Sequence, residues 1–326
     1  MSSERDIDFE RERNYRCQKC EHIFSVDWAF LDRWAQGVED CPNCGTPSSD
    51  EAAAKPWVYA DEPALDDQYL KDVAWYHTST FSKWPAIDVD PLSTLPEITI
   101  RRMGGQSKAQ AWAKRQRNKA LHLGTFEAAV HNMFRRISDQ GDEGKNFYIY
   151  RVLITPDAFI RSGWQLEQSN FVGDVSRDVI CPRPFTVARY LNEREDPGSI
   201  SLAIRPEAVL STQSVSLDEL RINEHRLAQL EERLTHASHL PDLPQRSVSG
   251  FKVHEDTSAL HTEARKITDE LAVDLPTPLR DRLWRATAID DIGISSWARW
   301  LIAVCAVATN PSGVLDQLDE QPIQAI

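Results

Sequence analysis

Four of the six cysteines lie in two Cys-x-x-Cys pairs, and this feature constrains the fold of the chain more than any other. Cys17 and Cys20 form the first pair, Cys41 and Cys44 form the second, and twenty residues separate the pairs. Each Cys-x-x-Cys turn directs two thiolates towards one point, so two turns complete a tetrahedron of sulfur around Zn²⁺. The sequence therefore predicts a four-cysteine zinc ribbon within residues 1–55.

The composition of this metal site indicates a structural role. Sulfur fills all four tetrahedral positions, which leaves no place for a reactive water molecule. Pro42 favours a turn, and Gly45 allows the positive φ that follows the last ligand. The alternative is a redox-active Cys-x-x-Cys pair. Between the pairs, apolar residues at helical spacing predict a short amphipathic helix. These residues are Phe24, Trp28, Leu31 and Trp34.

Composition narrows the class of protein. The 326 residues suffice for two or three domains, and 41% hydrophobic with 27% charged residues is typical of a globular chain. The net charge of −13 excludes a general nucleic-acid coat, which needs Lys and Arg in excess. Residues 1–14 are mostly charged and lack the apolar core of a signal peptide.

The longest apolar run, residues 297–309, contains Arg299 and is shorter than the roughly 20 residues that span a membrane. We therefore expect a cytoplasmic protein with no membrane partner, in which the paired cysteines are reduced metal ligands. The sequence leaves the oligomeric state open.

The middle of the chain reads as a strand-rich α+β domain over residues 70–215. Residues 47–70 are rich in Ser, Asp, Glu, Ala and Pro and are predicted to be a linker. A helix is expected at 125–137. Short apolar or alternating runs predict strands. The expected strands are 73–77, 97–101, 120–123, 146–154 and 200–204.

Residues 216–326 are predicted to form a helical C-terminal region. Apolar residues recur there at intervals of three and four, which is the spacing of a helix with one buried face. The expected helical stretches are 217–240, 257–272, 278–286 and 294–308.

Three segments of the middle domain carry residues suited to chemistry. They run from Trp75 to Ser79, from Leu121 to Ala129 and from Arg189 to Leu202. Each also has a simple structural reading. The first is a strand that ends near a polar residue, and in the second Thr125 caps a helix by accepting from the amide of Ala128. The third contains Glu-x-Glu-Asp-Pro-Gly, which is typical of a solvated turn before a strand.

In this order and at this spacing, the three segments resemble the ADP-ribosyltransferase fold, the family of the poly-ADP-ribose polymerases and the DNA-targeting bacterial toxins. The resemblance covers about residues 73–211. Tyr76-His77-Thr78 is similar to the first motif of the family, a strand ending in His and a small residue. Leu121–Ala129 is similar to the second, and Glu193 or Glu195 fits the glutamate of the third. The chain departs from the family pattern at Thr78, where Gly is common, and at His122, where an aromatic residue often lies.

The resemblance implies that NAD is a substrate and assigns roles to the residues of the motifs. Cleavage of the bond between nicotinamide and ribose produces an oxocarbenium-like sugar, which a carboxylate stabilises. Glu195, or else Glu193, would supply this carboxylate, and His77 would position the ribose. The remaining candidates would bind the cofactor, with backbone groups beside Thr78 on the nicotinamide amide and one of the aromatic rings stacked on the nicotinamide. These candidates are Tyr76, Thr78, His122, Thr125 and Phe126.

Residues 101–120 contain seven basic residues and no acidic residue. This segment is either the solvated face of a helix or an electropositive loop beside the NAD site. In the second case it would meet the NAD pyrophosphate or a nucleic-acid acceptor, and Trp112 would allow base stacking.

These patterns favour transfer of ADP-ribose from NAD to a macromolecular acceptor, either nucleic acid or protein. Use as a toxin or in defence against phage is an expectation from the family alone. Two alternatives remain open. One is a non-enzymatic zinc-ribbon adaptor that binds nucleic acid or protein, and the other is an NAD glycohydrolase in which water is the acceptor.

Overall fold

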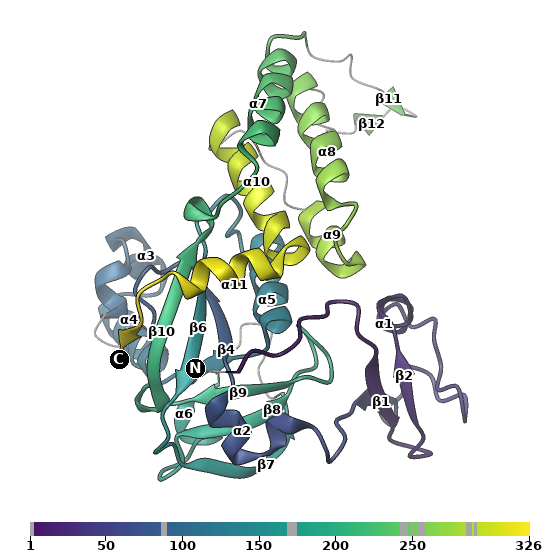
Figure 1. Ribbon diagram of the computed structural model, residues 1–326, viewed down its shortest axis with the longest axis vertical. Coiled ribbons are helices and arrows are strands. Elements are labelled where there is room, and N and C mark those ends of the chain that lie inside the picture. Colours follow the sequence, from purple (N-terminus) through teal and green to yellow (C-terminus); the bar gives the residue numbers. More distant parts are fainter. Residues whose placement is uncertain are drawn as a thin grey trace. The chain divides into compact units, whose positions relative to one another are not determined.

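The computed structural model describes residues 3–85, 90–167, 175–241, 247–248, 251–252, 258–284, 289 and 292–326. Within these residues the chain is a mixture of α-helices, labelled α1 to α11, and β-sheets (Figure 1). Contacts between the residues divide the chain into two compact units. The first contains Met1–Ala129, Tyr150–Ser214 and Pro322–Ile326, and the second contains Val130–Ile149 and Val215–Gln321.

A small three-stranded sheet forms the N-terminal part of the first unit. Its strand order is β2-β1-β3, with antiparallel pairing throughout. These strands are β1 (Arg13–Cys17), β2 (Ile23–Val26) and β3 (Ala54–Pro56). Helix α1 (Trp28–Ala35) follows β2 and begins at Asp27, whose side chain accepts a hydrogen bond from the amide of Phe30. The predicted helix between the cysteine pairs is thus present, although Phe24 belongs to the preceding strand.

The linker predicted at residues 47–70 is wrong, because this stretch is built into the fold. It contains β3, which pairs with the strand that carries Cys17, and the start of α2 (Asp67–Asp72). Asp66 caps α2 by accepting from the amide of Tyr69. Polar composition therefore concealed a strand whose partner lies about forty residues earlier in the chain.

A second sheet has the strand order β5-β9-β8-β7. The pairs β5–β9 and β9–β8 are antiparallel, whereas β8 and β7 are parallel. The strand predicted at 200–204 is confirmed as β9. Strands β7 and β8 were not predicted. The bounds of this sheet are β5 (Leu121–Leu123), β7 (Ile160–Leu166), β8 (Val187–Leu191) and β9 (Ile200–Ile204).

A third sheet has the order β13-β10-β6-β4. The C-terminal residues return to the first unit here, because β13 pairs antiparallel with β10. The bounds are β4 (Trp75–Ser79), β6 (Tyr148–Ile154), β10 (Val209–Ser216) and β13 (Gln324–Ala325). A separate two-stranded ladder joins β11 (Ser247–Val248) and β12 (Phe251–Lys252).

The strand predicted at 97–101 is wrong, because the segment is helix α3 (Glu97–Arg102). Pro96 precedes the helix, Glu97 lies in its first turn, and an ion pair joins Arg101 to Glu97 four residues before it. No residue of α3 is buried, so the alternation of Ile and Thr does not mark a sheet face. The remaining short helices of this unit are α4 (Gln106–Arg117) and α6 (Arg177–Ile180).

The second unit is helical. Its helices are α7 (Glu224–Ser238), α8 (Ala259–Ala272), α9 (Thr277–Trp284), α10 (Ile294–Thr309) and α11 (Pro311–Asp319), and most of α5 (Phe126–Asp139) also belongs to it. Helix α10 supplies much of the core, with Trp297, Leu301 and Val304 fully buried. The described part of the chain also contains four short 3-10 helices, at Pro63–Leu65, Pro91–Thr94, Pro206–Ala208 and Leu217–Glu219.

Within the described residues, no single helix is both long and apolar enough to cross a membrane. Helices α10 and α11 reach the required length and apolarity only as a pair, and that pair is bent by 98°.

An ion-pair network joins α7 to α8, which lie side by side (Figure 1). Arg233 of α7 contacts Glu263 at 2.8 Å and Glu270 at 2.7 Å, both on α8. The hydrogen bond from Arg233 lowers the pKa of Glu270 below its ordinary value of 4.5. A carboxylate with a lowered pKa contributes stability above its unfolded pKa and loses it as the pH falls.

We expect Arg233→Met to lower the free energy of unfolding by up to about 1 kcal/mol at pH 7, since the network is partly exposed. The difference from wild type should disappear as the pH falls below 4.5 and Glu270 becomes protonated. Thermal unfolding followed by circular dichroism at several pH values measures this. Lys266→Met is the control, because Lys266 is 63% exposed and lies 3.5 Å from Glu263. Equal destabilisation at pH 7 and pH 3 would contradict the ion-pair origin.

Candidate functional site

The four paired cysteines meet at one point of the first unit. Their sulfur atoms all lie within 4.8 Å of one another, and Cys17 Sγ is 3.7 Å from Cys44 Sγ, as Cys20 Sγ is from Cys41 Sγ. Zinc–sulfur bonds of about 2.3 Å in a tetrahedron require sulfur atoms about 3.8 Å apart. The cluster could therefore hold a metal ion.

The two Cys-x-x-Cys turns have the same backbone hydrogen bonds. The amide of Cys17 donates to His22 O at 3.0 Å, and the amide of Cys41 donates to Thr46 O at 2.8 Å. The residue that follows each pair has a positive φ, of 59° at Glu21 and 66° at Gly45. The conformation predicted for Gly45 is confirmed. Two equivalent turns explain why the four sulfur atoms converge.

Neighbouring polar groups favour thiolates in this cluster. The amide group of Asn43 donates to Cys20 Sγ at 3.5 Å and lowers the pKa of Cys20 to about 6. Thr46 Oγ1 lies 3.1 Å from Cys44 Sγ. Burial has the opposite effect on Cys41 and raises its pKa to about 11, so this thiolate needs a cation beside it. Donor type, spacing and second-sphere hydrogen bonds all fit a metal such as Zn²⁺.

The cysteines also belong to the core of the small N-terminal sheet. Cys17 and Cys41 are buried in one cluster with Tyr15, Trp28 and Leu31. Order in this core therefore depends on the same residues that would bind the metal.

His77 and His122, from two separate sequence motifs, lie together. His77 Nδ1 is hydrogen-bonded to His122 O at 2.9 Å. The neighbouring backbone pairs as well, because the amide of Tyr76 donates to Gly124 O at 2.9 Å and the amide of Gly124 donates to Tyr76 O at 3.0 Å. A Cβ atom at Gly124 would lie 2.8 Å from the Cβ of Ala128, so only glycine allows this approach.

Two aromatic residues that the sequence analysis missed pack against these histidines. The ring of Trp84 is stacked on His77 with centroids 4.4 Å apart. The hydroxyl of Tyr190, on β8, is 3.2 Å from His122 Nδ1. Trp84 lies outside the three segments, and Tyr190 lies in the third, where only the glutamates were singled out.

The other predicted ring contacts lie within the core. Tyr76 and Phe126 are both buried and pack edge to face, with centroids 5.2 Å apart. Phe9 from the N-terminal segment packs edge to face on Phe126. The hydroxyl of Tyr76 donates to the carboxylate of Glu4. These two rings therefore belong to the core that lies beneath the candidate site.

Both threonines of the motifs are hydrogen-bonded. Thr78 is buried, and its hydroxyl donates to Ala129 O at 3.0 Å. Thr125 Oγ1 accepts from the amide of Ala128 at 3.1 Å, which confirms the predicted helix cap of α5. The same hydroxyl donates to Asp196 Oδ2 at 3.3 Å.

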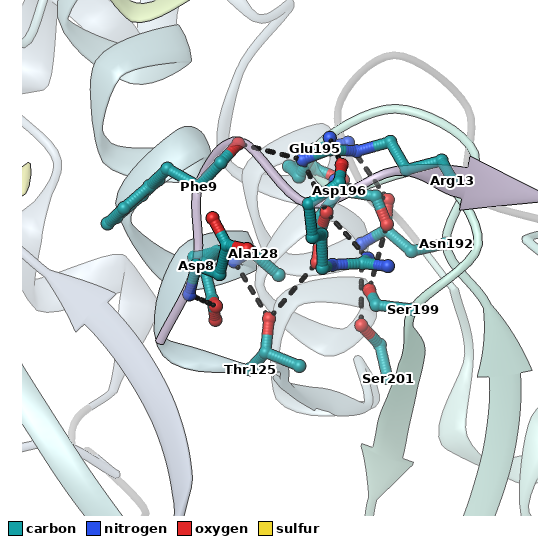
Figure 2. Close-up of polar contacts among 12 residues, drawn as sticks. Asp8, Phe9, Arg13, Thr125, Ala128, Asn192, Glu195, Asp196, Ser199 and Ser201 are labelled. Atoms are coloured by element: carbon teal, nitrogen blue, oxygen red, sulfur yellow. Dashed lines mark hydrogen bonds and ion pairs between the residues drawn. The ribbon is translucent and has the colours of Figure 1, made fainter. Parts of the chain in front are cut away.

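Glu193 and Glu195 lie on the turn Asn192–Ser199, here named the carboxylate loop. It joins β8 to β9, and β9 is the strand that pairs with the β5 strand of His122. Asn192 Oδ1 accepts from the amides of residues 194, 195 and 196 at 2.9 to 3.1 Å (Figure 2). The amide of Glu193 donates to Glu167 Oε2 at 3.0 Å.

The prediction of a solvated turn at this loop is wrong. Glu195 is 9% exposed and Asp196 is fully buried, whereas Glu193 is half-buried. The reason is that the segment before the four-cysteine sheet covers the loop. Arg11 of that segment and Arg13, the first residue of β1, form ion pairs with Asp196.

A second buried carboxylate lies near Asp196. Glu127, in the first turn of α5, accepts from the amide of Asp8 at 2.8 Å. Burial and the negative charge of Asp196 raise the pKa of Glu127. The N-terminal segment therefore contacts both the carboxylate loop and the helix that follows the second motif.

The basic segment at 101–120 forms the end of α3, helix α4 and the turn that leads to β5. Ala109 and Ala113 are the buried residues of α4, and its Lys and Arg side chains are exposed. Arg117 pairs with Asp90 at 2.8 Å. The segment is therefore a helix face and not a loop.

Comparison of the chain with protein-family models, with curated proteins and with solved structures finds no match.

We expect the purified protein to contain one metal ion per chain, bound by the four cysteines. Cys41→Ser should abolish metal binding and unfold the small N-terminal sheet, because the metal and its ligands share that core. Elemental analysis of the purified chain measures the metal content. Cys181→Ser is the control, since Cys181 is buried outside the cluster and its Sγ donates to Ala203 O, a bond that serine retains. Equal metal content in the two variants would contradict this assignment.

Proposed function

We propose that this protein transfers ADP-ribose from NAD to a macromolecular acceptor and that Zn²⁺ has a structural role in its N-terminal ribbon. The proposal of ADP-ribose transfer rests on one observation, which is that the segments carrying the sequence motifs lie next to one another. His77 of β4 contacts His122 of β5, and β5 pairs with β9, which begins just after the carboxylate loop. Three segments that resemble the motifs of the ADP-ribosyltransferase fold thus lie on neighbouring strands.

The reaction assigns each group a task. The bond between ribose C1′ and the nicotinamide nitrogen breaks, and both electrons leave with nicotinamide. Glu195, or Glu193 in the alternative assignment, stabilises the positive charge that grows on the sugar. An acceptor oxygen or nitrogen then bonds to C1′, and its proton passes to the carboxylate or to water.

The surroundings of His77 suit a positioning role. Its ring is fixed on one side by Trp84, and its Nδ1 is engaged by His122 O. A ring held in this way loses little side-chain entropy when it positions a ribose hydroxyl. Backbone groups at Thr78 would hold the amide of nicotinamide, and His122 and Thr125 would line the same region.

Zn²⁺ is the metal that best fits the four sulfur ligands. A closed set of thiolates has no open coordination position, so the ion would supply folding stability and no chemistry.

The exposed basic face of α4 favours nucleic acid as the acceptor. Lys108, Lys114 and Arg115 are exposed, within a chain of net charge −13. Such a local excess of positive charge attracts phosphates. Helix α4 leads through residues 118–120 into β5, the strand of His122. A nucleic acid on this helix would therefore approach the segment proposed to bind NAD.

A zinc-ribbon adaptor without enzymatic activity is the second candidate, because the four-cysteine cluster requires no NAD chemistry. An NAD glycohydrolase differs from the proposed transferase only in the acceptor. Nicotinamide release that does not respond to an added acceptor would identify it.

We expect Glu195→Gln to lower the rate of nicotinamide release by about 10² to 10³, as loss of one charge-stabilising group does in other enzymes. Glu193→Gln, the matched control on the same loop, should retain most of the rate. The reverse order would exchange the two assignments. Nicotinamide production from NAD, with cell extract as the source of acceptors, is the assay. Wild-type protein that neither binds NAD nor releases nicotinamide would leave only the adaptor.

We expect the triple variant K108Q/K114Q/R115Q to bind nucleic acid less tightly than wild type. The slope of log K against log salt should become shallower by about 2 to 3, at about 0.9 for each lost phosphate contact. Melting temperature should change little, because exposed charges contribute little to stability. The control is R226Q/R265Q/K266Q on α7 and α8, which removes the same charge from exposed positions. Equal loss of affinity in both variants would mean that α4 is a solvated helix face and not a specific site for nucleic acid.

A further inference from the structure

The carboxylate loop is held by two different sets of contacts, of which one is internal. Asn192 binds three consecutive amides of the loop, and the amide of Gly198 donates to Asn192 O at 3.0 Å. Ser199 Oγ donates to Asp196 O at 2.8 Å. These bonds fix the shape of the turn, but they do not fix its place on the molecule.

Asp196 fixes the place of the loop. Its carboxylate is fully buried, and both oxygens are engaged (Figure 2). Oδ1 lies 2.8 Å from Arg11 and 3.1 Å from Arg13, and Oδ2 accepts from Thr125. A buried carboxylate is tolerated only where cations and hydrogen-bond donors replace water. Asp196 is next to Glu195, so the position of one determines the position of the other.

Arg13 links this carboxylate to the four-cysteine ribbon. It is the first residue of β1, the strand that ends at the metal ligand Cys17. Its guanidinium is fully buried, lies 3.7 Å from the ring centroid of Trp28 and donates to Phe9 O at 3.2 Å. Trp28 in turn belongs to the core that contains Cys17 and Cys41 and donates through Nε1 to Phe9 O at 2.7 Å.

The ribbon contacts the carboxylate loop at other points too. A Cβ atom added to Gly198 would lie 3.5 Å from Trp57 O, just after β3, and 3.8 Å from Asn14 O, on β1. Burial and then the charge of Glu193 raise the pKa of Tyr15, which is on β1. One face of the ribbon is thus the surface on which the loop rests.

We propose that Asp196 is a positioning residue through which the metal-bound ribbon holds Glu193 and Glu195 in place. The effect on catalysis rests on the proposed function. The structural coupling between the ribbon and the loop does not depend on that function. Loss of the metal disorders the core around Trp28, and Arg13 then no longer has a fixed position. Asp196 is left without its fully buried partner, and the loop leaves its place beside α5 to solvate the charge. Metal loss therefore disables the site without touching His77 or His122.

Hydrogen exchange measured by mass spectrometry tests the coupling in the full chain. Three samples are compared: metal-loaded wild type, wild type after chelation, and metal-loaded Asp196→Asn. We expect exchange at residues 193–199 to rise about tenfold or more in the second and third samples, with the metal content of Asp196→Asn unchanged. Helix α8, in the other unit, should exchange equally in all three. Unchanged exchange at 193–199 after chelation, with raised exchange at 17–44, would overturn the proposal.

Arg11→Gln is a second variant that leaves the Arg13 contact in place. Arg11 is 31% exposed, so its replacement removes one of the two cations with little risk to folding. We expect it to raise loop exchange less than Asp196→Asn does. A larger effect from Arg11→Gln would count against Arg13 as the link.

The nicotinamide assay on the same samples separates this inference from the proposed function. Asp196→Asn should lower kcat by about tenfold to a hundredfold, the scale of a catalytic group displaced by about 1 Å, with KM for NAD nearly unchanged. A raised KM with unchanged kcat would overturn the positioning role. Absence of nicotinamide release from wild type would instead refute the proposed function, while the exchange result still decides the coupling.

Discussion

The buried carboxylate of Asp196 imposes the strongest constraint on the first unit. A charge removed from water requires partners of opposite sign, and here they come from Arg11 and Arg13, the latter 183 positions away in sequence. Thr125, which also caps α5, supplies a further hydrogen bond. One side chain therefore joins the N-terminal segment, the start of a central helix and the loop between β8 and β9.

The four-cysteine cluster extends this constraint into the N-terminal sheet. The sheet has three short strands and packs with a single helix, α1. A core of this size is rarely stable without a cross-link such as a bound metal ion. The two equivalent turns place their sulfur atoms at the spacing that a tetrahedral metal requires. Because Arg13 lies on the same strand as Cys17, strand β1 connects the metal-binding cluster directly to the buried charge of Asp196.

The meeting of β4 and β5 depends on close backbone approach. Gly124 has room for a hydrogen atom and no more beside Ala128, and its amide and carbonyl pair with Tyr76. His77 follows directly and reaches the carbonyl of His122. The arrangement brings His77 and His122, forty-five residues apart in sequence, into contact, and the proposed chemistry rests on that contact.

Local patterns in the sequence determined those features that depend on near neighbours. The paired cysteines, the positive φ of Gly45 and the cap at Thr125 were predictable because turn and cap geometry is decided within a few residues. Strand β9 was predictable from a short run that is apolar except for Ser201.

Tertiary structure alone decided the rest. The segment 97–102 resembles a strand because Ile and Thr alternate in it, but it forms a helix with no buried residue. Without burial against a sheet, the alternation does not stabilise an extended conformation. Strand β3 lies in a stretch of polar composition but pairs with β1, and Glu195 and Asp196 lie in a turn that would be solvated in isolation. They are buried because two arginines from the start of the chain neutralise Asp196. Burial and ion pairing depend on residues that are distant in sequence and meet only in the folded chain. A local sequence pattern therefore cannot predict them.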